Sequence, residues 1–90
     1  MNILVTGGAG YIGSNLVDQL VGSGHTVSVL DDLSTGKRSN LSSSMTDIEF
    51  VEGSILDEDV VRREVARVEL VFHLAAAVGV GNIVAEPLQS

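Results

Sequence analysis

A glycine-rich turn between an apolar strand and an amphipathic helix constrains the fold of this chain more than any other feature. Residues 2–6 are apolar and end at glycines, which predicts a strand buried on both faces, as in a parallel sheet. Residues 12–21 then show the apolar spacing of a helix with one buried stripe, which begins at Ile12. A strand that passes through a tight turn into a helix is typical of a βαβ unit.

The rest of the chain continues this alternation of strand and helix. Residues 26–30 are rich in β-branched side chains and residues 48–52 alternate apolar and polar, so both indicate strands, the second at a sheet edge. Asp57 is suited to cap a helix that directs valines inward and arginines outward. Residues 70–74 indicate a fourth strand, whereas the serine-rich residues 33–47 predict a loop or a poorly formed helix.

These elements predict an α/β fold, in which a Rossmann-type parallel sheet of about four strands has the order 3-2-1-4 and is flanked by helices. Because 90 residues is less than an ordinary domain, we assign residues 1–90 to the amino-terminal portion of one such domain, without a second domain. We therefore expect the chain to be a fragment of a longer protein. After the fourth strand we expect a loop from Ala75 and a helix from near Pro87.

The glycine turn has the pattern that binding of a dinucleotide diphosphate requires. Such a diphosphate needs unpaired N–H groups at a helix start, and any Cβ on the approaching loop would hold the phosphates off. We expect Gly7 to make the tight turn, Gly10 to let the loop approach the phosphates and Gly13 to let the helix pack closely on the strand. The N–H groups of Tyr11 and Ile12 are then the predicted phosphate donors.

A carboxylate at the end of the second strand favours this interpretation over a purely structural glycine bend. Asp31 lies about 20 residues after the turn, where the dinucleotide-binding fingerprint requires an acidic residue. Its carboxylate would accept hydrogen bonds from the adenosine ribose and repel a 2′-phosphate, so the predicted cofactor is NAD rather than NADP. Lys37 and Arg38 could reach a 2′-phosphate, but a basic pair in a polar loop is usually solvated.

Four segments, spread over nearly the whole chain, carry recognisable motifs. Residues 6–15 read TGGAGYIGSN, residues 30–36 read LDDLSTG, residues 53–57 read GSILD and residues 73–76 read HLAA. These segments resemble the motifs TGGxGYIGS, DNLSTG, GDIxD and HLAA of the NAD-dependent nucleotide-sugar epimerases and dehydratases, which are UDP-glucose 4-epimerase-like extended short-chain dehydrogenases. Four such motifs in the right order are specific for the group and less specific for its substrate.

The resemblance implies a cofactor site built from four loops. It assigns Asp31 and Asp32 to the adenosine ribose, residues 33–36 to the surroundings of that ribose, residues 54–55 to the adenine and residues 74–76 to the floor under the cofactor. With the glycine turn, the predicted cofactor-binding residues are Gly7, Gly10, Tyr11, Ile12, Gly13, Asp31, Asp32, Leu33, Ser34, Thr35, Gly36, Ser54, Ile55, Leu74, Ala75 and Ala76. We predict no metal ligand and no catalytic residue.

Two positions depart from the family pattern, and two further residues do not fit a catalytic role. Ser54 stands where the family usually has an aspartate for the adenine amino group, so we expect weaker NAD binding. Asp32 replaces the more common asparagine, for which the sequence offers no account. His73 lies in a buried strand and is predicted to be packed rather than a base. Tyr11, the only tyrosine, is not followed by the lysine of the family's YxxxK motif.

The resemblance implies an enzyme that acts on a nucleotide sugar. In the resembled family, NAD takes a hydride from C4 of the sugar while a tyrosine removes the hydroxyl proton, and the keto intermediate is then epimerised or dehydrated. Two alternatives stay open: a non-catalytic NAD(P)-binding sensor or truncated module, and an NADP-dependent reductase of the same superfamily. A YxxxK motif beyond Ser90 would favour the enzyme, and its absence would favour the sensor.

Composition limits the partners and the location. Twelve acidic residues against five basic ones give a net charge of -7, which argues against nucleic acid as a partner. The chain has no cysteine, no basic leader and no apolar run of the roughly 20 residues that a membrane span needs, so we expect a cytoplasmic protein without membrane contact. The fourth strand would leave an unpaired edge in the half-sheet, so we also expect self-association.

Overall fold

The computed structural model describes residues 1–75. In chain order, their elements are β1 (Asn2–Thr6), α1 (Tyr11–Gly22), β2 (Thr26–Asp31), the short 3₁₀ helices η1 (Arg38–Leu41) and η2 (Met45–Asp47), β3 (Ile48–Glu52), α2 (Glu58–Val65) and β4 (Leu70–His73). The predictions for Ala76 and for a helix near Pro87 lie outside the described residues.

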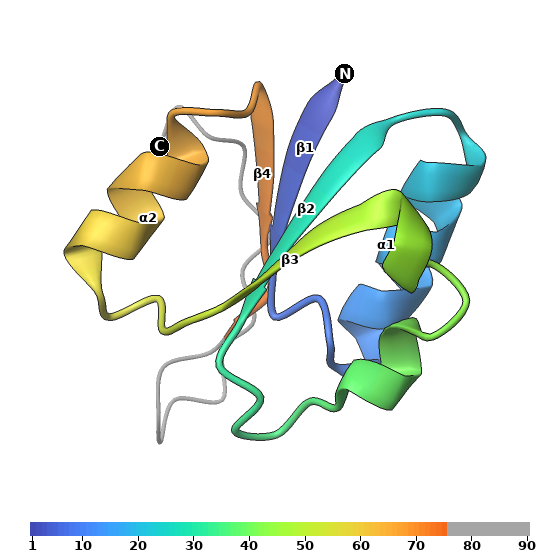
Figure 1. The fold of residues 1–90 in the computed structure, drawn as a ribbon, viewed down its shortest axis with the longest axis horizontal. Coiled ribbons are helices and arrows are strands. Elements are labelled where there is room, and N and C mark those ends of the chain that lie inside the picture. The colour runs from blue at the N-terminus through green and yellow to red at the C-terminus, as the bar shows by residue number, and fades with distance from the viewer. Residues whose placement is uncertain (76–90) are drawn as a thin grey trace.

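The four strands form one parallel sheet in the order β3-β2-β1-β4, as the sequence predicted (Figure 1). β1 lies between β2 and β4, with Val5 opposite Val29 of β2 and Phe72 of β4. Ile3, Leu4 and Val5 of β1 are each at most 1% exposed. A strand that is apolar on both faces takes the centre of a parallel sheet, and the amphipathic β3 takes an edge.

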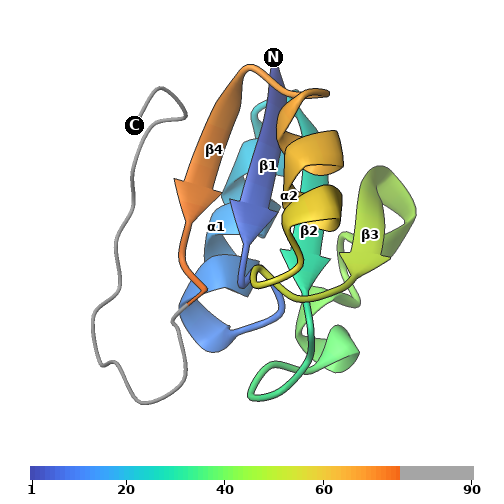
Figure 2. The same cartoon turned by 90° about the vertical axis from the view of Figure 1, so that its left-hand side faces the viewer.

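Helices cover both faces of this sheet (Figures 1 and 2). α1 packs on the face that carries Val5 and Val29, and its Val17 is fully buried there. α2 packs on the opposite face, around Leu4 and Leu30. Because successive strand residues point to opposite faces, this arrangement requires apolar residues at both odd and even positions of β1 and β2.

The first helix begins one residue earlier and ends one residue later than its apolar spacing predicted. The prediction that Ile12 begins the buried stripe is wrong, because Ile12 is 62% exposed. The first turn of α1 lies beside the turn that follows β1, at the carboxyl end of the sheet, whereas later turns lie over the strands (Figure 2). Ile12 therefore has no strand to cover it, whereas Val17 of a later turn is fully buried.

The serine-rich residues 33–47 are more ordered than a loop. They contain η1 and η2, and Leu41 of η1 is fully buried in the core shared with α1. The hydroxyl of Ser44 donates a hydrogen bond to the carboxylate of Asp18 in α1. One buried leucine and polar contacts of this kind dock the segment on α1.

The second helix starts at the predicted cap and contains a buried carboxylate that the sequence pattern did not indicate. Asp57 accepts hydrogen bonds from two N–H groups of the first turn, at 3.1 and 3.3 Å. Glu64 is 3% exposed and accepts a hydrogen bond from Arg67 at 3.0 Å. Arg67 also bonds Glu49 of β3, and this hydrogen bond holds the pKa of Glu49 below its ordinary value. A buried carboxylate is tolerated because it has such a cationic partner.

Three absences hold for residues 1–75. β4 pairs with β1, and no described strand pairs with its other side. None of the helices in this range has the length and apolar character needed to cross a bilayer. In the same range, no three His, Asp or Glu side chains are grouped closely enough to hold a metal ion.

Candidate cofactor-binding site

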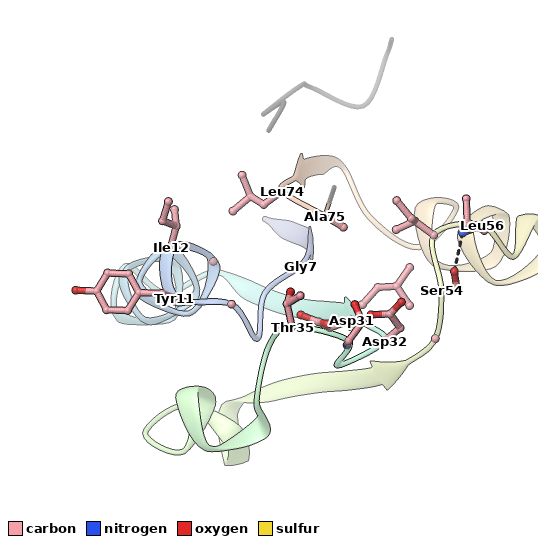
Figure 3. A pocket seen from close by; sticks show the side chains of 16 residues that line it. Gly7, Tyr11, Ile12, Asp31, Asp32, Thr35, Ser54, Leu56, Leu74 and Ala75 are labelled. Atoms are coloured by element: carbon pink, nitrogen blue, oxygen red, sulfur yellow. Dashed lines mark hydrogen bonds between the residues drawn. The ribbon is translucent and has the colours of Figure 1, made fainter. Parts of the chain in front are cut away.

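A cleft of about 730 Å³ lies at the carboxyl ends of the strands (Figure 3). Connections that leave neighbouring strands toward opposite faces of a parallel sheet open a crevice at that end, which is where such folds bind ligands. The residues that line the cleft are Gly7, Gly10, Tyr11, Ile12, Gly13, Leu30, Asp31, Asp32, Ser34, Thr35, Gly53, Ser54, Ile55, Leu56, Leu74 and Ala75.

The structure brings together thirteen of the sixteen predicted cofactor-binding residues in this cleft. Leu33 and Gly36 do not line it, and Ala76 is outside the described residues. Leu30, Gly53 and Leu56 line it without having been predicted. Leu56 is 74% exposed. Its position, as an apolar residue between the end of a strand and the cap of a helix, could have indicated a cleft residue.

The glycines of the turn are required for different reasons. Gly7 has a φ of +74°, and a Cβ there would lie 2.8 Å from the backbone nitrogen of Ala75. A Cβ on Gly13 would lie 2.3 Å from the carbonyl oxygen of Gly7, so the close packing predicted for Gly13 is made against the turn after β1. A Cβ on Gly10 would meet only the Gly7 oxygen, at 3.4 Å, within the described part of the chain. Gly10 therefore leaves space on the cleft side.

The start of α1 presents unpaired donors to this space. Gly10 is the N-cap, its N–H donates to the carbonyl oxygen of Gly7, and Ser14 makes the first helical hydrogen bond back to Gly10. The N–H groups of Tyr11, Ile12 and Gly13 have no acceptor among residues 1–75. The first turn also carries no acidic residue. Three N–H groups without an acceptor in the described part of the chain, together with the positive end of the helix dipole, form an arrangement that favours an anion.

Asp31 lies beside the glycine turn with its carboxylate directed at it. The side chain is 8% exposed. Its Oδ2 accepts a hydrogen bond from the N–H of Ala9, and its Oδ1 accepts one from the N–H of Leu33, both at 2.8 Å. Each carboxylate oxygen has two lone pairs, so both oxygens retain one for a hydroxyl donor in the cleft.

The next two residues shape the loop that follows β2. Asp32 accepts a hydrogen bond from the N–H of Ser34 at 2.9 Å, and this bond holds the pKa of Asp32 below its ordinary value. An asparagine makes the same turn through its side-chain oxygen, which accounts for the exchange of the two residue types at this position. Leu33 has a φ of +62°, a left-handed conformation that is unusual for leucine, and it is held by the bond to Asp31.

Ser54 lies at the opposite end of the cleft from Tyr11 and Ile12 (Figure 3). Its hydroxyl oxygen accepts a hydrogen bond from the N–H of Leu56 at 3.0 Å. The hydroxyl hydrogen and one lone pair remain, so Ser54 is able both to donate to and to accept from a ligand.

Thr6 organises the exit of β4. Its hydroxyl oxygen accepts hydrogen bonds from the N–H groups of Leu74 at 3.1 Å and Ala75 at 3.3 Å, and it lies 2.8 Å from Nδ1 of His73. The Thr6 side chain thereby links the end of β1 to the end of β4 and to the two residues that follow it. His73 is half-buried and hydrogen-bonded, as predicted for a packed histidine.

Neither basic residue of the loop after β2 lines the cleft. The guanidinium of Arg38 is 3.3 Å from the carboxylate of Glu52 and 4.5 Å from the ring centre of Phe50. The backbone N–H of Lys37 donates to the carbonyl oxygen of Ala9, and its side chain is exposed. The arginine is thus engaged by Glu52 and Phe50 of β3.

A parallel sheet of this order, with a glycine turn into α1 and an acidic residue at the end of β2, defines the Rossmann-type class of dinucleotide-binding folds. The sequence matches the NAD dependent epimerase/dehydratase family over residues 3–89, and the chain belongs to that family.

Known members show how much of the family's fold this chain contains. It is 46% identical to UDP-glucose 4-epimerase of Mycolicibacterium smegmatis, over 97% of this chain and 29% of that protein. A solved UDP-glucose 4-epimerase of Thermotoga maritima with UDP-glucose is 51% identical, with a TM-score of 0.78, over 87% of this chain and 25% of that one. A dTDP-glucose 4,6-dehydratase of Bacillus anthracis in complex with NAD is 33% identical, with a TM-score of 0.79, over 86% and 27%. The chain thus spans less than a third of these relatives and corresponds to their amino-terminal part.

Gly13→Ala should destabilise the chain by about 1–3 kcal/mol, because the new methyl group overlaps the carbonyl oxygen of Gly7 and cannot move away from backbone atoms. The matched control is Gly22→Ala in the same helix, where a Cβ would meet no described atom within 4 Å. The control should be neutral or slightly stabilising. Urea unfolding followed by circular dichroism measures both changes, and equal stability of the two variants would contradict the close packing.

Proposed function

We propose that this chain is the NAD-binding part of a nucleotide-sugar epimerase or dehydratase. The observation that carries the proposal is the cleft in which three unpaired N–H groups at the start of α1 lie across from the Asp31 carboxylate. A dinucleotide diphosphate fits the N–H groups of Tyr11, Ile12 and Gly13, and the adenosine ribose fits Asp31. This order along the cleft brings the adenine to Ser54.

Charge in the cleft supports NAD over NADP. Asp31 and Asp32 both line it, and the low pKa of Asp32 keeps that carboxylate ionised. A 2′-phosphate on the ribose would meet these carboxylates at close range. Arg38, which would have to neutralise such a phosphate, is paired with Glu52 and stacked on Phe50.

The proposed reaction of the whole protein follows from the family. Bound NAD supplies a reversible hydride acceptor, and we assign the hydride transfer to C4 of a nucleotide sugar. The residues of this chain bind and orient the cofactor and do not supply the catalytic tyrosine. The lone tyrosine, Tyr11, is 80% exposed and is followed four residues later by asparagine, not by the lysine of a YxxxK motif. The similarity to an epimerase solved with UDP-glucose supports a nucleotide sugar as the partner.

Titration calorimetry with NAD and NADP tests the proposal, with Gly10→Ala as the diagnostic variant. NAD should bind, and NADP should bind roughly tenfold or more weakly. Gly10→Ala should weaken NAD binding by a similar factor because its methyl group enters the space for the diphosphate. The φ of Gly10 is -75°, so the same change should cost less than about 1 kcal/mol of folding stability.

Two results of that titration would contradict the proposal. One is the absence of NAD binding by the folded wild-type chain, and the other is equal affinity for NAD in the wild type and Gly10→Ala.

Ser54→Asp should tighten NAD binding roughly 3- to 10-fold, because a carboxylate accepts a stronger hydrogen bond from the adenine amino group than a hydroxyl does. The carboxylate is also able to keep the bond to the N–H of Leu56. Ser39→Asp adds the same charge at an exposed position outside the cleft and is the matched control. Calorimetry with NAD and with AMP provides the measurement. Unchanged or weaker binding by Ser54→Asp would assign the adenine elsewhere.

The proposal extends to self-association through β4. No described strand pairs with the outer side of β4, and exposed strand edges pair with other chains. Sedimentation velocity should give a sedimentation coefficient that rises with concentration. A single monomeric species at the highest concentration would rule this contact out.

A further inference from the structure

The loop after β2 holds the backbone of Ala9 from both sides. The N–H of Ala9 donates to Asp31 at 2.8 Å. Its carbonyl oxygen accepts two hydrogen bonds, from the side-chain amide of Asn40 at 2.8 Å and from the N–H of Lys37 at 3.1 Å. Ala9 is fully buried, so these bonds replace water at the backbone groups on either side of its Cα.

The carbonyl of Ala9 is covalently coupled to the donors at the start of α1. It belongs to the same planar peptide unit as the N–H of Gly10, which donates to the carbonyl oxygen of Gly7 at 3.2 Å. Gly10 is the N-cap of α1, and the free N–H groups of Tyr11 and Ile12 follow it directly. A rotation of the Ala9–Gly10 peptide plane would therefore change the direction of these donors.

Asn40 is itself anchored independently of the cleft. It lies in η1, its N–H donates to the carbonyl oxygen of Lys37 at 3.0 Å, and the next residue, Leu41, is fully buried in the core. Gly36 packs directly on Ala9, since a Cβ on Gly36 would lie 2.7 Å from the carbonyl carbon of Ala9. The segment from Gly36 to Leu41 is thus packed against, and hydrogen-bonded to, the glycine turn.

We infer that Asn40 is a positioning residue for diphosphate binding, acting through the carbonyl of Ala9. Asn40 is not among the residues that line the cleft. The inference rests on the proposed binding of a dinucleotide, and it adds a residue outside the glycine turn whose amide sets the direction of the phosphate donors.

The first test compares ADP with adenosine as probes in titration calorimetry. Asn40→Ala should weaken ADP binding roughly 3- to 10-fold, the value of one hydrogen bond, and leave adenosine binding within about twofold. Asn40→Asp keeps the size of the side chain but turns an oxygen toward the Ala9 carbonyl, so it should weaken ADP binding at least as much. Ser39→Ala is the control, because Ser39 is an exposed neighbour in η1 whose side chain makes no hydrogen bond within residues 1–75. Equal losses for ADP and adenosine, or no loss for ADP, would overturn the inference.

A second measurement needs no ligand and separates this inference from the proposed function. Amide hydrogen exchange followed by NMR reports on the N–H groups of Gly10 and Ser14, which are both hydrogen-bonded in the turn. Their protection should fall in Asn40→Ala and stay unchanged in Ser39→Ala, while the protection of the β1 amides is retained. Unchanged protection of Gly10 would overturn the support by Asn40. If protection falls in Asn40→Ala but the wild-type chain does not bind ADP, the support by Asn40 is upheld and the proposed function is refuted instead.

Discussion

The arrangement of the cleft depends on one buried interaction, in which the Asp31 carboxylate accepts the N–H groups of Ala9 and Leu33 at 2.8 Å each. A carboxylate that is 8% exposed is costly unless it is hydrogen-bonded. Here the donors come from two different loops, so the bond to Ala9 ties the end of β2 to the turn after β1, and the bond to Leu33 holds a left-handed residue. The acidic group and the start of α1 are thereby fixed relative to each other.

The strands, their order and the main site residues were predictable from local signals. The β1 residues are apolar at successive positions, which only a buried central strand satisfies, and Asp57 precedes a helix in the position of an N-cap. The position of Asp31 followed from the spacing between the glycine turn and the end of β2, because that spacing is one βαβ half-unit. Each of these signals depends on residues close in sequence or on a fixed repeat length.

The missed features depend on which segments meet in space. Leu41 lies in a serine-rich stretch without periodicity, so its burial against α1 could not be anticipated. Glu64 is charged and would be expected at the surface, yet it is nearly buried and accepts a hydrogen bond from the more exposed Arg67. The prediction for Ile12 is wrong in the opposite sense, because a side chain expected to be buried is exposed. Its helical spacing is correct, but the first turn of α1 extends past the sheet, so the pattern indicates a buried face where there is no strand to cover it.

Relatives with different reactions share the fold of this chain, and the chemistry of the glycine turn is compatible with that. An epimerase and a dehydratase superimpose on this chain with TM-scores of 0.78 and 0.79, although their sequence identities to it are 51% and 33%. The glycine turn acts through backbone N–H groups and missing side chains, which are preserved as long as the turn keeps its shape. The side chains of Ser54 and Asp32 instead use one hydrogen bond each to shape their own loop. Under the proposed function, changes at these two positions would alter the affinity for the dinucleotide and leave the glycine turn unchanged.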